Sequence, residues 1–383
     1  HLALSGPHIK GFNSRGVIAV AGKNREITRD DVRRAIDAAK AVPPSIGLAH
    51  KAAAWSYSVL AVAAAARGDA SAALAVLADE QHVVPPARCV LGLAIEDRRR
   101  AIVARDAAGN ATVHHDEARQ TPAIDPRALV PPEVAAGFAG CPVVEVIARP
   151  PIHGMARLLP DAIAWGYLSQ RARPADRSGD EPGVRAGERS GHRSVVVADV
   201  EPPAALELPR LATWSSTAAR ASSSAATTLS GPQATPSRVL AAIGSADDVV
   251  IHAHGIVDLA LPDASFLALS PEPDGRFALT TADVRKARFT ARPLVVLAAC
   301  RASQAAPVWH ETWSLPAAFV YAGARAVIAS AAPIPDAGAA AFFDDVRARV
   351  RGGAPVAVAV RDARQVWLAA RRGDWVRDVI VFE

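Results

Sequence analysis

Short apolar runs alternate with amphipathic segments along most of the chain. The clearest runs, residues 247–255, 293–300 and 326–330, are rich in Val, Ile and Ala. Runs of this length without polar alternation are typical of strands buried on both faces of a parallel sheet. The segments between and after them, such as 315–322 and 338–351, place apolar residues at helical spacing. The pattern therefore predicts an α/β fold with a mostly parallel sheet.

The region before these runs contains several different kinds of predicted segment. It divides into predicted paired strands, a buried strand, a loop rich in Arg, Gly, Asp and Ser, a further strand, a helix and a Ser/Thr-rich loop. These segments are, in the same order, residues 89–95 with 99–105, then 141–148, 171–193, 194–200, 208–221 and 222–235. Because residues 171–193 lack any hydrophobic period, we expect them to form an exposed, flexible loop.

A short helical hairpin is predicted before this region. Residues 52–66 and 70–80 are rich in Ala and are separated by Arg-Gly-Asp, a turn that resembles the one in a tetratricopeptide repeat. One repeat cannot bury its own apolar face, so the hairpin is either the end of an array or a packing element. We therefore predict three regions: residues 1–44, a hairpin at 45–84, and a larger region at 85–383 that divides after residue 193.

Composition narrows the possible functions. Half of the 383 residues are hydrophobic, and the mean hydropathy of +0.14 allows a sizeable core. The net charge is +5, but the arginines are scattered without interleaved aromatics, which does not favour nucleic-acid binding. The most apolar run is well under the ~20 residues that a membrane span needs. The three cysteines show no paired framework and no secretory signal is visible, which predicts a reducing, cytoplasmic location.

Two of the apolar runs end at residues able to do chemistry. His254 ends the run at 247–255, and Cys300 ends the run at 293–300. If the two strands are neighbours, the side chains meet at one rim of the sheet and form a thiolate nucleophile with an imidazole partner. Gly255 has no side chain, so its N–H could stabilise an oxyanion together with the N–H of Cys300. The alternative is that Cys300 is a buried structural thiol and His254 a core histidine.

We predict no metal or cofactor. The chain shows no phosphate-binding loop, no dinucleotide-binding fingerprint and no HExxH motif.

The two strand ends resemble a known family. His-Ala-His-Gly at 252–255 and Val-Val-Leu-Ala-Ala-Cys at 295–300 are similar to the CHAT family of caspase-like and separase-like cysteine peptidases. The likeness continues at 194–199, 265–269, 279–284 and 316–330. It implies a caspase-like α/β/α sandwich and a cysteine endopeptidase with His254 as base and Cys300 as nucleophile. Its implied partner is a protein substrate or effector; the oligomeric state stays open.

Departures from the family pattern keep a second function open. Arg-Ala-Ser follows Cys300 where the family usually reads Glu-Thr-Gly, and no Trp follows Ser330. Residues near these positions are candidates for substrate binding: Asp258, Arg301, Ser330 and Asp336. The altered residues favour the alternative that the chain is a catalytically inactive CHAT-like scaffold for protein–protein interaction.

The first part of the chain resembles a different family. Residues 5–42 predict a strand followed by a helix capped at Thr28. Their sequence is similar to that of the small inserted subdomain of FtsA, a bacterial cell-division protein. None of the FtsA nucleotide-binding motifs follows, so the resemblance implies an FtsA-like fragment without ATP binding. A cell-division ATPase is the third class of function, and it depends on these residues alone.

Overall fold

The computed structural model describes residues 60–96, 99–116, 125–149, 151–172, 192–215, 226–257, 265–304 and 314–383. The chain divides into two units, His1–Trp55 and Ser56–Glu383, and all of the described residues belong to the second. The FtsA-like fragment and the beginning of the helical hairpin lie outside the described residues.

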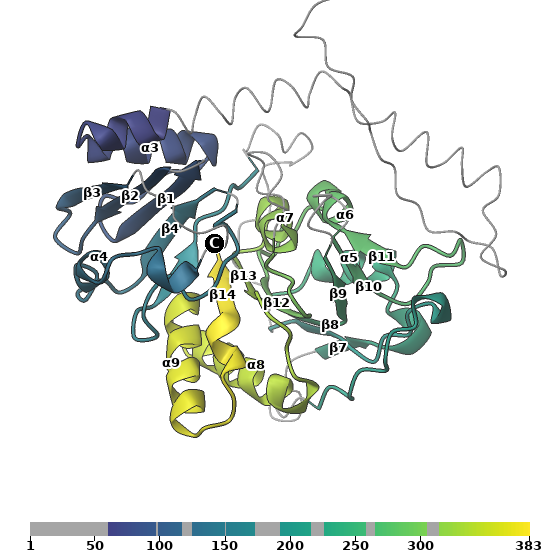
Figure 1. Ribbon diagram of the computed structural model, residues 1–383. Coiled ribbons are helices and arrows are strands. Elements are labelled where there is room, and N and C mark those ends of the chain that lie inside the picture. Colours follow the sequence, from purple (N-terminus) through teal and green to yellow (C-terminus); the bar gives the residue numbers. More distant parts are fainter. Residues whose placement is uncertain are drawn as a thin grey trace, which may run out of the picture. The chain divides into compact units, whose positions relative to one another are not determined.

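Within the described residues, one large sheet runs through the second unit (Figure 1). Its eleven strands, in spatial order, are β3 (Ala111–Asp116), β2 (Arg99–Arg105), β1 (Val90–Glu96), β4 (Val144–Ala148), β5 (Trp165–Tyr167), β14 (Val379–Phe382), β13 (Ala326–Ser330), β12 (Leu294–Ala298), β8 (Asp248–His252), β6 (Ser194–Val197) and β7 (Ala226–Leu229). Strands β13, β12, β8, β6 and β7 pair in parallel, as do β1, β4, β5 and β14. Antiparallel pairs join β14 to β13 and build the hairpins β1–β2 and β2–β3.

Helices cover both faces of this sheet (Figure 1). They are α3 (Ala70–Glu80), α4 (Pro132–Ala136), α5 (Pro236–Ile243), α6 (Thr281–Lys286), α7 (Leu315–Ala322), α8 (Asp336–Arg351) and α9 (Val356–Ala369). In β12, Val295 and Leu297 pack into the same core as Phe319 of α7, whereas Val296 packs with Phe342 of α8. Because successive strand residues point to opposite faces, α7 and α8 lie on opposite sides of the sheet. The predicted α/β sandwich with a mostly parallel sheet is confirmed.

The strands at the centre of the sheet are buried along their whole length, as the unbroken apolar runs predicted. Every residue of β8, β12 and β13 is buried, which includes the polar Asp248, His252 and Ser330. No helix in the described part of the chain is both long and apolar enough to cross a membrane.

The segment after β6 differs from its prediction. We expected a helix over residues 208–221, but residues 207–215 follow a short 3-10 helix at Ala204–Leu206 without helix or strand structure. Pro202, Pro203 and Pro209 each lack an N–H, and a proline disfavours helical backbone at the residue before it. The predicted loop at 222–235 also contains a strand, β7, which pairs with β6 at the edge of the sheet.

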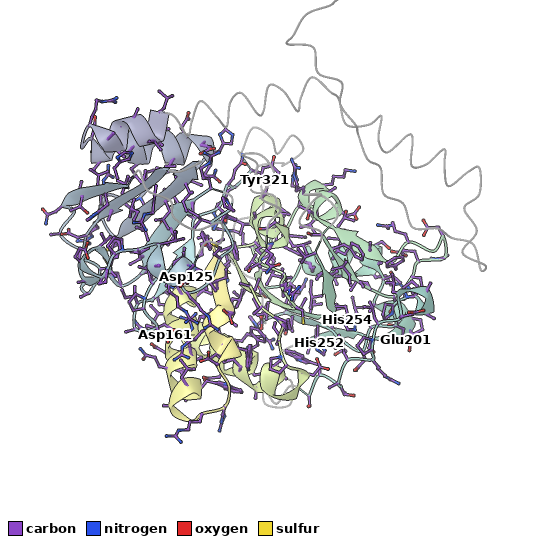
Figure 2. All side chains as sticks on the ribbon, in the orientation of Figure 1. Asp125, Asp161, Glu201, His252, His254 and Tyr321 are labelled. Carbon is purple, nitrogen blue, oxygen red and sulfur yellow. A yellow bond between two sulfur atoms is a disulfide. The ribbon has the colours of Figure 1, made fainter. Side chains whose placement is uncertain are left out.

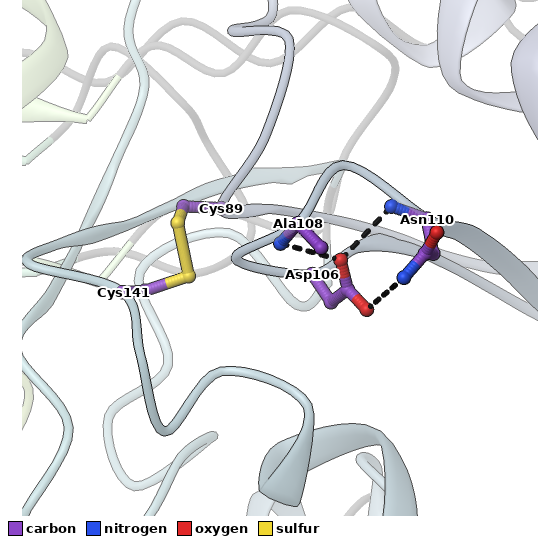
Figure 3. Close-up of a disulfide and its surroundings, with 5 residues drawn as sticks. All are labelled: Cys89, Asp106, Ala108, Asn110 and Cys141. Atoms are coloured by element: carbon purple, nitrogen blue, oxygen red, sulfur yellow. Dashed lines mark hydrogen bonds between the residues drawn. A yellow bond between two sulfur atoms is a disulfide. The ribbon is translucent and has the colours of Figure 1, made fainter.

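The cysteine prediction was wrong. Cys89, just before β1, and Cys141, just before β4, form a disulfide with their Cα atoms 5.6 Å apart (Figure 3). The two strands pair in parallel, which brings these residues together although they are 52 positions apart. Among the described residues, Cys300 alone is a free thiol. The cytoplasmic location remains a prediction, but unpaired cysteines no longer support it.

A turn next to the disulfide organises the hairpin that follows. Asp106, between β2 and β3, accepts hydrogen bonds from the N–H groups of Ala108 (2.8 Å) and Asn110 (2.9 Å) and from the Asn110 side chain (Figure 3). These bonds lower the pKa of Asp106, with the side-chain bond from Asn110 as the largest cause. The N–H of Cys89 donates to the Asp106 carbonyl, so a backbone hydrogen bond links the disulfide to this turn.

Candidate active site

The two strands that carry the predicted dyad are neighbours. β8 and β12 pair in parallel, and His252 lies opposite Ala298. Parallel neighbours end at the same edge of a sheet, so residues 253–255 and 299–301 leave the sheet side by side. The adjacency on which the predicted site depends is therefore present.

His254 itself does not belong to the large sheet. The predicted continuous strand at 247–255 breaks at Ala253, and His254 begins β9 (His254–Ile256). β9 pairs with β10 (Phe266–Ala268), which pairs with β11 (Ala278–Thr280), to form a separate three-stranded sheet. This second sheet holds the backbone of His254 at the rim of the first.

The imidazole of His254 has a defined orientation. Its Nε2 lies 2.7 Å from the carbonyl oxygen of Pro209, in the segment after the 3-10 helix at Ala204–Leu206. A carbonyl oxygen can only accept a hydrogen bond, so Nε2 carries the proton in the neutral ring. Nδ1 is then left as an acceptor, which is the form that a general base requires.

Gly255 lies directly against Cys300. A Cβ atom at position 255 would collide with the carbonyl oxygen of Cys300 and would lie 3.5 Å from the side chain of Ala299. The backbone that carries the imidazole is thus in contact with the backbone that carries the thiol. This close approach explains why the position after His254 is a glycine.

The thiol of Cys300 is half-buried and has a backbone partner. The N–H of Ile334 donates to Sγ at 3.4 Å, and Sγ lies 3.9 Å from the carbonyl oxygen of the same residue. No described residue accepts a backbone hydrogen bond from the N–H of Cys300. This N–H thus fits the predicted role of an oxyanion donor.

The loop after Cys300 is fixed on two sides. Arg301 has a left-handed φ of 55°, so the chain turns sharply there, and its N–H donates to the carbonyl of Ala332. The N–H of Ser303 donates to the carbonyl of Ser330, and its hydroxyl donates to the carbonyl of Gly154 at 3.0 Å. The region before residue 193 therefore helps to hold the loop that presents the thiol.

The candidate substrate-binding residues have different surroundings. Arg301 is exposed. Ser330 is fully buried, and its hydroxyl donates to the carbonyl of Ala332 at 2.9 Å. Asp336 begins α8 and accepts a hydrogen bond from the N–H of Ala212. Asp258 lies outside the described residues. Substrate binding by these four residues remains a prediction.

His252, the last residue of β8, is buried and lies near the start of helix α8. Its Nε2 is 3.7 Å from Oδ1 of Asp336, and its ring centroid is 4.9 Å from that of Trp214. Burial lowers the pKa of His252, and the nearby carboxylate of Asp336 opposes this only in part. Figure 2 labels both histidines. In the described part of the chain, no group of three or more His, Cys, Asp or Glu residues is arranged to hold a metal ion.

Two parts of the site were not predicted from the sequence. The Pro209 carbonyl that orients His254 and the Ile334 N–H that contacts Cys300 are backbone groups, which every residue type can supply. Because their roles depend on where the chain passes, residue identity gives no signal for either.

Replacing Gly255 by Ala should disrupt the site. The added methyl collides with the Cys300 carbonyl, so the backbone must shift, and overpacking of this kind costs about 1–3 kcal/mol. We expect a lower midpoint of urea unfolding and a changed rate of Cys300 alkylation. Gly244→Ala is the control, because its φ suits any residue and a Cβ there would make only ordinary contacts, the nearest at 3.5 Å. An unchanged alkylation rate in Gly255→Ala would contradict the close contact.

Comparison with known proteins finds a short match in the first part of the chain. Residues 6–47 match the SHS2 domain inserted in FtsA. A stretch of 41 residues is 51% identical to the cell division protein FtsA of Borreliella burgdorferi, covering 11% of this chain and 10% of that protein. The predicted resemblance to FtsA is confirmed for this stretch, which spans about a tenth of the length of the relative.

A later and longer part of the chain matches a different family. One similar solved structure is the complex of Porphyromonas gingivalis RgpB pro- and mature domains, at 12% identity and a TM-score of 0.35, covering 57% of this chain and 55% of that one. The family profile of the CHAT domain matches residues 156–378, which is more than half of the chain and includes His254 and Cys300. The chain therefore belongs to the CHAT domain family.

Proposed function

We propose that the chain is a cysteine endopeptidase that cuts a protein partner through the dyad of Cys300 and His254. The observation that carries the proposal is the contact between Gly255 and the Cys300 carbonyl, which brings the strand end with the imidazole against the strand end with the thiol. The hydrogen bond from His254 Nε2 to Pro209 adds support, because it leaves Nδ1 able to accept a proton.

The chemistry follows from these groups. Nδ1 of His254 accepts the thiol proton of Cys300, and the sulfur attacks the carbonyl carbon of the scissile peptide bond. The N–H groups of Gly255 and Cys300 stabilise the resulting oxyanion. The tetrahedral intermediate collapses to a thioester, and the imidazolium donates its proton to the leaving amine. His254 then takes a proton from a water molecule, and the water oxygen attacks the thioester carbon. The C–S bond breaks, the carboxylic acid product leaves, and the imidazolium returns its proton to the sulfur to restore the thiol.

The surroundings of the dyad provide candidates for selecting the substrate. Arg301 is exposed next to the nucleophile and could pair with an acidic side chain of the partner. Asp258 and Asp336 could receive a basic one, and Ser330 lies at the end of the neighbouring strand β13. The reaction as written needs no cofactor, because the nucleophile, base and oxyanion donors are all groups of the chain.

Alkylation of Cys300 tests the proposal. An electrophilic peptide probe should label the oxidised wild-type protein at Cys300, since Cys89 and Cys141 are held in the disulfide. Removal of the base by His254→Ala should slow labelling by about 100-fold, the lower end of the range for general acid–base catalysis. Cleavage of a peptide library by the wild type but not by Cys300→Ala would support the proposal and give the preferred cleavage sequence. Equal labelling rates in the wild type and His254→Ala would count against an activated thiol.

A second candidate function is a scaffold that binds protein partners and cuts nothing. The sequence Arg301-Ala302-Ser303, in place of the usual family residues after the cysteine, favours it. A scaffold would retain partner binding in Cys300→Ala and would show no difference between the wild type and this variant in any cleavage assay.

A further inference from the structure

The segment that orients His254 lacks regular structure. Residues 207–215 belong to no helix or strand, so no ladder of backbone hydrogen bonds fixes their position. The Pro209 carbonyl in this segment nevertheless lies within 2.7 Å of His254 Nε2. Catalytic groups have to be held to within about 0.5 Å of their productive geometry. The position of the imidazole therefore depends on the contacts that hold this segment against the rest of the protein.

Two contacts attach the segment to helix α8. Three residues after Pro209, the N–H of Ala212 donates to Oδ2 of Asp336, the first residue of α8, at 3.1 Å. Trp214 stacks on Phe343, also in α8, with ring centroids 6.5 Å apart. These contacts lie on either side of Thr213, so the segment is held at two points close to the carbonyl that meets His254.

Asp336 also faces the strand that leads to the base. Its Oδ1 is 3.7 Å from Nε2 of His252, the last residue of β8, and His254 follows two residues later. One carboxylate thus contacts both the segment that carries the Pro209 carbonyl and the strand that carries the imidazole.

We infer that Asp336 is a positioning residue for the catalytic base: its carboxylate holds Ala212 and so fixes the Pro209 carbonyl that orients His254. The inference rests on the proposed function, because it assigns Asp336 to the same site. It gives Asp336 a different role from the substrate binding that the sequence predicted. One carboxylate oxygen is already engaged by the segment, whichever substrate is present.

The test compares Asp336→Ala with two matched variants. Asp336→Asn keeps an oxygen that can accept from Ala212. Asp345→Ala removes a carboxylate from the same helix that pairs only with Arg349 among the described residues. The imidazole nitrogen shifts of His254, assigned by the signal that His254→Ala removes, report which ring nitrogen carries the proton. We expect Asp336→Ala to lose the preference for protonated Nε2 and to alkylate Cys300 about tenfold more slowly. Asp336→Asn should keep the nitrogen shifts of the wild type, and Asp345→Ala should match the wild type in both measurements.

Two outcomes would overturn the inference: nitrogen shifts of His254 that do not change in Asp336→Ala, or equal losses in Asp336→Ala and Asp345→Ala. If Asp336→Ala does not fold, Trp214→Ala removes the other contact and should change the same shifts; unchanged shifts there would also overturn it. Failure of the proposed function has a different signature, because Cys300 would then react equally with and without His254. The nitrogen shifts would still report whether Asp336 orients the ring.

Discussion

Replacing Arg347 by Met should lower the free energy of unfolding by about 3–5 kcal/mol, because the change leaves buried carboxylates without their main partner. Arg347 lies in α8 with 3% of its surface exposed. Its guanidinium donates to both carboxylate oxygens of Asp248, at 2.6–3.0 Å, to Asp344 at 2.9 Å and to Ser194 at 3.0 Å. Asp248 begins β8, so this cluster fixes the strand that leads to His254.

The pH dependence of this effect follows from Asp248. Burial raises the pKa of this carboxyl, but the nearby His192, with Nε2 3.8 Å from Oδ2, and the hydrogen bonds from Arg347 more than offset this effect, and the net pKa lies below its usual value. A lowered folded-state pKa contributes stability that is present above the unfolded pKa and is lost as the pH falls through the folded one. The gap between wild type and Arg347→Met should therefore be largest near neutral pH and should narrow in acid.

Urea unfolding of matched variants measures the effect. Arg349→Met removes a surface pair with Asp345 on the same helix and should cost less than about 1 kcal/mol. The double variant Arg347→Met with Asp248→Leu should recover part of the loss, because no unpaired charge remains at position 248. A single Arg347→Met variant within about 1 kcal/mol of the wild type would show that the cluster is not a stabilising element.

Loss of the Cys89–Cys141 disulfide should cost about 4 kcal/mol. The bond closes a loop of 52 residues, and the loss of chain entropy on closing such a loop in the unfolded state gives this magnitude. The variant with both Cys89→Ser and Cys141→Ser should unfold at lower urea than the oxidised wild type, and reductant should not affect it.

The matched control for this prediction is Cys300→Ser, which removes the free thiol and should keep the response of the wild type to reductant. Mass spectrometry of the alkylated protein counts the free thiols directly. Three alkylated cysteines in the folded, oxidised protein would show that the disulfide does not form.

The sequence predicted the strands of the C-terminal region well because their patterns are simple. β8, β12 and β13 are buried on both faces, and that environment selects short unbroken runs of Val, Ile, Leu and Ala. β7 was missed because its residues Ala-Thr-Thr-Leu are mostly exposed at the sheet edge, so no hydrophobic pattern marks it. The helix predicted at 208–221 was wrong over its described part, where the prolines and the contacts of Trp214 decide the path.

From the sequence, only those parts of the candidate site that depend on side-chain chemistry could be predicted. His254 and Cys300 were proposed because each follows an apolar run, and the pairing of β8 with β12 places the ends of these two runs side by side. The partners Pro209 and Ile334 act through backbone groups and come from other parts of the chain. Cys89 and Cys141 could not be paired from their spacing, because their proximity exists only once β1 and β4 pair.

The position of β14 has a consequence for synthesis on the ribosome. It follows every other strand of the large sheet in the sequence, yet it lies between β5 and β13. Until Val379–Phe382 is synthesised, the edges of Trp165–Tyr167 and Ala326–Ser330 that pair with it have no partner strand. Open edges recruit other strands, so these two are where chaperone protection during translation matters most.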